Sequence, residues 1–83
     1  MTTLELETTP TKTIDARGSF CPGPLMELIR AIREGQTGDV LAVISSDNGS
    51  KTDIPAWVDK AGHRLVGVFN HDGYDEIVVE KLK

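Results

Sequence analysis

Residues 20–35 read FCPGPLMELIRAIREG, a stretch that combines a helix start, an apolar stripe and a helix stop. Its apolar side chains recur with the spacing of one helical face, at Leu25, Leu28, Ile29 and Ile32. Gly35 follows the last of them and suits the end of a helix. The stretch therefore predicts an amphipathic helix that ends just before Gly35 and lays one apolar face against a sheet.

Two prolines mark the start of this helix. Proline suits the first helical position, because its φ is already helical and its missing N–H would be unpaired there. The pattern predicts Cys21 as the N-cap and Pro22 as the first helical residue, with the sulfur accepting the Gly23 N–H. Gly23 has no Cβ, which relieves the steric clash that Pro24 imposes on the residue before it. The positive end of a helix lowers a cysteine pKa from about 8.5 to roughly 3.5–7.5 in favourable sites. We therefore expect an exposed, reactive thiol, with Arg17 adding charge if its loop folds back.

The rest of the chain predicts one more helix and four strands. Strands are expected at Lys12–Ala16, Val40–Ser45, Arg64–Asn70 and Glu76–Leu82. The second helix is expected to begin near Thr52 or Asp53, with Pro55 in its first turn and Gly62 after its end. The order βαβαββ predicts an α/β (α+β) two-layer sandwich, with two helices on one face of a four-stranded mixed sheet.

Length and composition limit the classes of protein. The 83 residues contain no repeat, so we expect a flexible segment over residues 1–11 and a single domain over residues 12–83. Leu4 and Leu6 are too few apolar residues for a signal peptide or membrane span, which predicts a cytoplasmic protein. A single cysteine excludes an intramolecular disulfide, and a net charge of −4 argues against a general nucleic-acid binder.

Five aromatic and imidazole side chains have structural interpretations. Trp57 is expected in the core and Tyr74 on the surface of the last hairpin. His63 and His71 form no metal signature with a single cysteine, so no metal is predicted. Phe20 is expected to staple onto the first helix, with an exposed docking anchor as the alternative.

Two segments carry a family resemblance. The first is Asp15-Ala16-Arg17-Gly18 followed by Cys21-Pro22-Gly23-Pro24-Leu25, and the second is Asp53-Ile54-Pro55 with Trp57 after it. Together they resemble the TusA family of sulfur carrier proteins, also called the SirA or YedF type, over roughly residues 12–82. Many members have Asp-Asp-Pro after the second strand, where this chain has Ser46-Asp47-Asn48. That departure bears on the identity of the partners.

The resemblance implies a βαβαββ protein that carries sulfane sulfur on Cys21 as a persulfide or thiosulfonate. Pro22, Gly23 and Pro24 would then shape the surroundings of that cysteine, and Asp15 and Arg17 would be supporting members of the motif. The implied donor is a cysteine desulfurase or rhodanese-like protein, and the acceptor is another protein. The pathways implied are tRNA thiolation, molybdenum cofactor biosynthesis and sulfur oxidation.

Further expectations concern partners and catalysis. Phe20 and Lys51 are candidate docking residues, no cofactor is expected, and a monomer would leave the cysteine free for docking. A nucleophilic cysteine enzyme usually needs a nearby base, and nothing in the sequence places His63 or His71 beside Cys21. The residues therefore favour a sulfurtransferase-type carrier over a stand-alone enzyme.

Two other classes of function stay open at this point. An exposed cysteine of low pKa also suits a redox-sensing or regulatory docking module, which would form mixed disulfides but carry no transferable sulfur. Two-layer α/β sandwiches also occur among RNA-binding domains, although the net charge of −4 and the lack of an aromatic sheet motif argue against that class here. We do not expect nucleic-acid binding.

Overall fold

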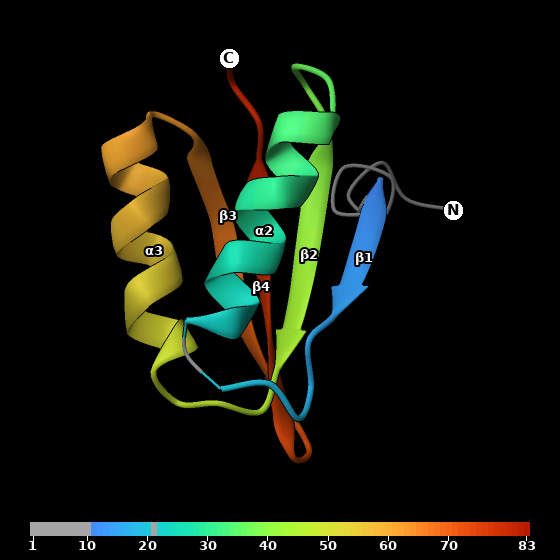
Figure 1. Ribbon diagram of the computed structural model, residues 1–83, viewed down its shortest axis with the longest axis vertical. Coiled ribbons are helices and arrows are strands. Elements are labelled where there is room, and N and C mark those ends of the chain that lie inside the picture. The colour runs from blue at the N-terminus through green and yellow to red at the C-terminus, as the bar shows by residue number, and fades with distance from the viewer. Residues whose placement is uncertain (1–10, 21) are drawn as a thin grey trace.

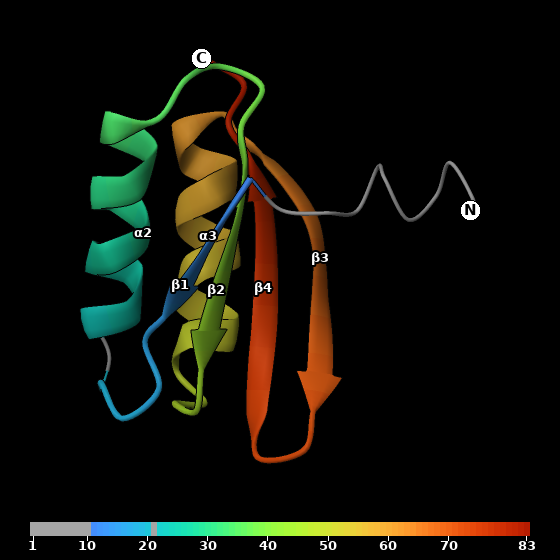
Figure 2. The same cartoon turned by 90° about the vertical axis from the view of Figure 1, so that its right-hand side faces the viewer.

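The computed structural model describes residues 11–20 and 22–83. Its elements are β1 (Lys12–Asp15), α2 (Gly23–Glu34), β2 (Val40–Ser45), α3 (Ser50–Ala61), β3 (Arg64–His71) and β4 (Tyr74–Glu80). The strands form one sheet in the order β1-β2-β4-β3, and both helices lie on the same face of it (Figures 1 and 2). The predicted βαβαββ two-layer architecture is confirmed.

The register of the sheet explains which strand residues meet the helices. β1 pairs with β2 in parallel, and β4 pairs antiparallel with both β2 and β3. Ile14, Val43, Ile77 and Val68 stand in one cross-strand row. Successive side chains of a strand point to opposite faces, so this row and the rows two residues away face the helices.

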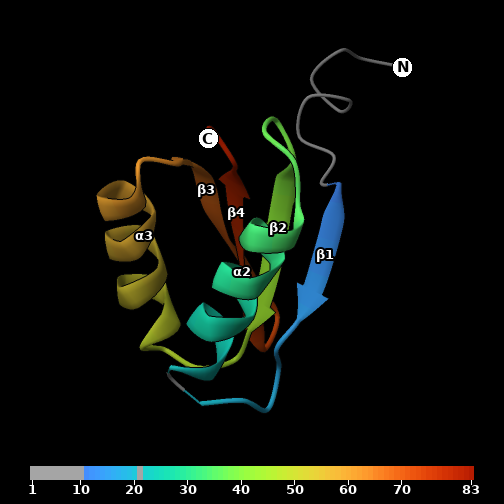
Figure 3. The ribbon, with the colours of Figure 1, turned by 45° about the horizontal axis from the view of Figure 1, so that its top comes forward.

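The core lies between this sheet face and the two helices. Figure 3 shows α2 in front of β2 with α3 beside it, and α3 packs against β3 and β4. The predicted stripe of α2 supplies Leu28 and Ile32, and α3 supplies Ile54 and Val58. Trp57 packs against this core without being fully buried. The core cluster is completed by Ala16, Ala31, Leu41, Val43, Ile77 and Val79.

Helix α3 begins earlier than the sequence pattern predicts. Its first residue is Ser50, not Thr52 or Asp53, and Pro55 therefore lies in the second turn of the helix. The Ser45 hydroxyl donates to the Ser50 hydroxyl at 3.2 Å, and both serines are buried. This bond holds the end of β2 against the first turn of α3, which explains why the chain becomes helical directly after Gly49.

Two turns follow α3, and each contains a glycine with positive φ. Gly62 adopts φ 84°, and the next N–H, that of His63, donates to the Val58 carbonyl at 3.0 Å, which ends the helix as predicted. The β3–β4 hairpin turns at Asp72 and Gly73. Because His71 already pairs with Tyr74, the turn is shorter than predicted and β4 begins two residues before Glu76.

None of the helices in the described part of the chain is long and apolar enough to cross a membrane.

Replacing Leu28 with Ala should lower the free energy of unfolding by about 2–5 kcal/mol, the usual cost of a cavity at a fully buried leucine. Leu28 has no exposed surface, whereas Met26 on the same helix is exposed. Met26→Ala is therefore the matched control and should change stability by no more than about 0.5 kcal/mol. Urea denaturation of both variants checks this, and equal losses would contradict the assignment of the buried face of α2.

Candidate functional site

The loop between β1 and α2 forms a compact turn that carries the predicted site. The Ala16 N–H donates to the Ile44 carbonyl at 2.8 Å, which extends the β1–β2 pairing by one bond. The Ser19 N–H then donates back to the Ala16 carbonyl at 3.1 Å. Gly18, at φ 89°, occupies a backbone conformation that favours glycine, and its N–H donates to the Ser46 hydroxyl at 3.3 Å. The loop is thereby fixed to the residues that follow β2.

The first turn of α2 begins one residue later than predicted. Pro22 is the N-cap, with φ −93° and ψ 19°, and its carbonyl accepts the Met26 N–H at 2.9 Å. The Gly23 N–H donates to the Phe20 carbonyl at 2.6 Å. The prediction of Cys21 as N-cap is therefore wrong, because Pro22 takes that position and the Phe20 carbonyl accepts the Gly23 hydrogen that the sulfur was expected to accept.

The two other residues of the predicted motif have clear packing roles. Pro24 is fully buried, so it anchors the first turn of α2 in the protein. Gly23 lies close to the loop, since a Cβ added there would be 3.2 Å from the Ser19 Cβ. Larger residues would push the loop away from the helix. Gly23 and Pro24 thus keep the first turn of α2 packed closely against the loop that follows β1.

Cys21 lies outside the described residues, and its neighbours in the chain define the site. Phe20 is 80% exposed, so the predicted staple onto α2 is wrong and the ring is free for contact with another molecule. Pro22 is exposed as well. Residues 22–25 contain no acidic side chain that would offset the positive end of the helix dipole. This end of α2 therefore favours an anion.

Asp15 and Arg17, the supporting members of the motif, form a tight pair at the start of the loop. Arg17 donates from Nε and Nη2 to the two carboxylate oxygens of Asp15, at 2.9 and 2.7 Å, and its backbone N–H donates at 3.1 Å. These bonds from Arg17, the side-chain ones foremost, lower the pKa of Asp15 to about 2. The pair lies on the surface, and its geometry stiffens the loop.

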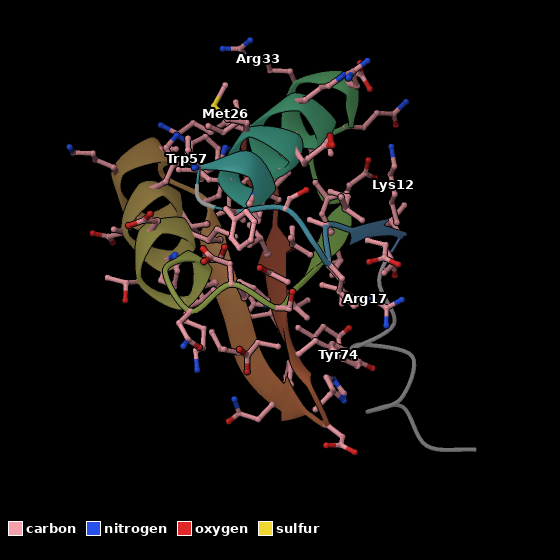
Figure 4. The ribbon with its side chains drawn as sticks, turned by 60° about the horizontal axis from the view of Figure 1, so that its bottom comes forward. Lys12, Arg17, Met26, Arg33, Trp57 and Tyr74 are labelled. Carbon is pink, nitrogen blue, oxygen red and sulfur yellow. The ribbon has the colours of Figure 1, made fainter. Side chains whose placement is uncertain are left out.

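Tyr74 joins this pair to the hairpin. The Arg17 guanidinium lies 5.3 Å from the centre of the Tyr74 ring, and Figure 4 shows the two side chains together. Tyr74 in turn stacks on His71 at 4.8 Å, and His71 Nε2 lies 2.9 Å from Glu76 Oε1. Tyr74 was expected simply on the hairpin surface, but it is half-buried and contacts the loop before the cysteine.

Lys51 lies at the start of α3 in an ion pair. Its Nζ is 3.5 Å from Asp75 Oδ2, and the Asn70 amide donates to Asp75 Oδ1 at 2.5 Å. Asp75 is buried, so a nearby cation and amide reduce the cost of its charge. The starts of α2 and α3 and the β3–β4 turn all lie at one end of the molecule (Figure 1). Lys51 belongs to that end, with part of its charge committed to Asp75.

Met26 is an exposed apolar residue that the sequence analysis did not single out. It is 59% exposed and points outward from α2 (Figure 4), beside a shallow groove whose walls include Ser19, Gly23, Arg30 and Arg33. The sequence does contain a sign of this exposure, because Met26 is apolar but stands outside the buried stripe of the helix. Together with Phe20 it gives the start of α2 two exposed apolar side chains.

The described residues contain no group of three His, Asp or Glu side chains that would hold a metal ion. His63 and His71 lie in different parts of the fold and have different partners. His63 Nδ1 accepts the Leu82 N–H at 3.1 Å, and burial, aided by Lys81 and Lys83, lowers its pKa. His71 belongs to the hairpin.

Comparisons with known proteins agree on one family. The model of the family described as sulfurtransferase TusA matches residues 12–81. An Archaeoglobus fulgidus protein described as a candidate sulfur carrier protein is 56% identical over 70 residues, covering 84% of this chain and 96% of that protein. The sulfur carrier protein TusA of Pseudomonas entomophila is 44% identical over 55 residues, covering 66% and 69% of the two chains.

A solved structure is also similar. The crystal structure of the SirA-like protein from Desulfitobacterium hafniense superposes with a TM-score of 0.78 at 26% identity, covering 87% of this chain and 99% of that one.

The pKa of Asp15 tests the pairing with Arg17. In the wild type, a carboxyl-carbon NMR titration should give a pKa of about 2, and Arg17→Gln should return it toward the ordinary value of about 3.9. Since the pKa is lowered in the folded protein, the stabilisation from this pair is present above the ordinary pKa and is lost as pH falls toward 2. An unchanged Asp15 titration in Arg17→Gln would contradict this pairing.

Proposed function

Because the chain belongs to the TusA family, whose members are sulfur carrier proteins, we propose that Cys21 carries a sulfane sulfur atom between two proteins. The observation that carries the proposal is the exposure of Phe20 and Pro22, the residues before and after Cys21 in the chain, directly ahead of the positive end of α2. A thiolate or persulfide anion is favoured in such a setting.

The proposed loading step is an exchange at sulfur. The Cys21 thiolate attacks the terminal sulfur of a donor persulfide, R–S–SH, and the donor S–S bond breaks. The products are Cys21–S–SH and the donor thiolate, R–S⁻. The sulfane sulfur moves without a net change of oxidation state, so the step needs neither an oxidant nor a reductant. An acceptor thiolate then removes the terminal sulfur from Cys21 in the same way.

The surroundings support a carrier more than an enzyme acting alone. A cysteine enzyme places a base next to its nucleophile, but the two histidines of the chain are committed elsewhere. His63 accepts a backbone hydrogen from Leu82, and His71 lies between Tyr74 and Glu76. The proposed carrier therefore relies on its donor, a cysteine desulfurase or rhodanese-like protein, and on its acceptor protein for catalysis.

The docking surface that we propose consists of Phe20 and Met26. Both are exposed apolar residues, Phe20 before the cysteine in the sequence and Met26 after it, and an exposed aromatic ring is a common anchor of protein interfaces. Arg33 on the same helix adds positive charge beside Met26, whereas Arg30 already pairs with Glu34 at 3.5 Å and Glu27 also lines the groove. Lys51 is a weaker candidate, because its ammonium group already pairs with Asp75.

Sulfur loading on Cys21 is tested by intact mass. Wild-type protein incubated with a cysteine desulfurase and cysteine should gain the mass of one sulfur atom, which a thiol reductant removes and cyanide converts to thiocyanate. Tetrathionate should instead add an S–SO₃ group and release thiosulfate if the protein carries thiosulfonate. Cys21→Ser is the matched control and should gain nothing. Equal loading of Cys21→Ser, or formation of mixed disulfides without any transferable sulfur, would overturn the proposal and favour a redox-sensing module.

Phe20→Ala separates docking from thiol chemistry. We expect kcat/KM for transfer from a cysteine desulfurase to fall about tenfold, as for loss of an anchor worth roughly 1.4 kcal/mol. The rate of Cys21 alkylation by iodoacetamide should stay unchanged, because that small reagent needs no docking. Leu82→Ala, another exposed apolar residue, is the control and should transfer normally. If alkylation and transfer slow equally in Phe20→Ala, the ring acts on the thiol and not on the partner.

A further inference from the structure

Strand β3 is an edge strand whose outer side is open. It is last in the order β1-β2-β4-β3, and β4 pairs with its inner side over Arg64–His71. Figure 2 shows it at the opposite edge of the sheet from β1. Within the described residues no strand pairs with its outer side. An edge of this kind presents a row of backbone donors and acceptors to another strand.

The regular part of β3, Gly67–His71, leaves this edge unprotected. Proteins usually guard an edge strand with a short length, charged side chains, proline or a β-bulge. β3 has such features only at its start, where Arg64 is charged and the register shifts between Leu65 and Gly67. β1 follows that practice, with four residues that include exposed Lys12 and Asp15. Between Arg64 and His71, β3 has no charged residue and no proline. It exposes apolar side chains instead, with exposed fractions of 37% for Leu65, 37% for Val68 and 44% for Phe69.

Phe69 marks the centre of the regular part of the strand. A register shift between Leu65 and Gly67 interrupts the pairing with β4, and the pairing is regular from Gly67 to His71. Phe69 stands opposite Glu76 and its ring lies over Gly67, where an added Cβ would be 2.9 Å from the ring. The ring is thus held flat on the sheet face away from the helices, with part of its surface open.

We propose that β3 pairs antiparallel with β3 of a second copy of this chain, about a two-fold axis at Phe69. The two phenylalanines then stand opposite each other, and Gly67 stands opposite the second copy's His71. This register uses only the regular segment and leaves the bulge outside the interface. The two four-stranded sheets become one continuous sheet.

Charge favours a second copy as the occupant. Arg64 lies at one end of the strand and Asp72 lies in the turn just beyond the other end. Antiparallel pairing brings Arg64 of each copy toward Asp72 of the other, once on each side of the axis. Arg64 donates from Nε to Glu80 at 2.7 Å and keeps further N–H donors for this contact. Because the two-fold is closed, the pairing stops at a dimer.

The paired edge lies across the sheet from the start of α2. α3 packs against β3 and β4, while α2 packs against β2, on the β1 side of the sheet. The expectation of a monomer rested on the need for a free docking end, and pairing through β3 satisfies the same need. A single strand pair is a small interface, and interfaces below about 1,200 Å² in total are usually weak and transient. We therefore expect an equilibrium that depends on protein concentration.

Sedimentation velocity from low-micromolar to near-millimolar protein tests the pairing. Wild-type protein should shift from monomer to dimer, and Phe69→Lys should weaken the dimer more than tenfold, because it places two lysines face to face at the axis. Phe20→Lys makes the same substitution at the other exposed phenylalanine, far from β3 in the sequence, and should dimerise like the wild type. Both lysine variants are checked for an unchanged fold by circular dichroism.

A second measurement does not depend on the variants. Backbone NMR of wild-type protein should show concentration-dependent shifts and slower hydrogen exchange for outward-facing amides of Gly67–His71, with no such change in β1. A wild type that stays monomeric throughout, a dimer that Phe69→Lys does not weaken, or association that continues beyond a dimer would overturn the proposal. Sulfur loading on Cys21 is measured separately, so failure here leaves the proposed function untouched.

Discussion

The parallel pairing of β1 with β2 is the constraint on which the rest of the structure depends. Parallel neighbours cannot be joined by a tight turn, so the chain must return along the full length of the sheet between them. α2 makes that return, and it therefore begins at the end of β1. The same pairing sends β2 in the same direction, so α3 begins at that end too. Two helix starts consequently lie at one end of the molecule, next to the end of the loop that follows β1 (Figure 1).

Polar contacts then determine the details of this end. The Ser45–Ser50 hydroxyl pair fixes the start of α3, and the Asp15–Arg17 pair stiffens the loop before α2. Tyr74 connects that loop to the hairpin through Arg17. These contacts are individually modest, since exposed ion pairs contribute little to stability. Their common effect is to fix positions, because they hold four segments at this end of the molecule: the end of β2, the start of α3, the loop after β1 and the hairpin.

The sequence was sufficient for the architecture because hydrophobic spacing dominates it. The stripe of α2 and the β-branched run of β2 permit few alternatives. The helix starts were harder to predict for a local reason. Proline suits the first helical position, so the pattern favours Pro22 there, but Pro22 is the N-cap and the helix begins at Gly23, whose N–H donates to the Phe20 carbonyl. Exposure of Phe20 and the Arg17–Tyr74 contact depend on segments far apart in the sequence, which no local pattern reports.

The two surfaces that we assign to this chain use different layers of the sandwich. The proposed carrier site belongs to the helix layer and its connecting loop, whereas the proposed pairing edge, β3, belongs to the sheet. Strand pairing extends a sheet in its own plane, so it adds a second copy without covering the start of α2. A paired carrier would then offer two loaded cysteines to one partner assembly. Linking two binding modules raises the effective concentration of the second, so even a weak pairing would favour repeated sulfur transfer within one encounter.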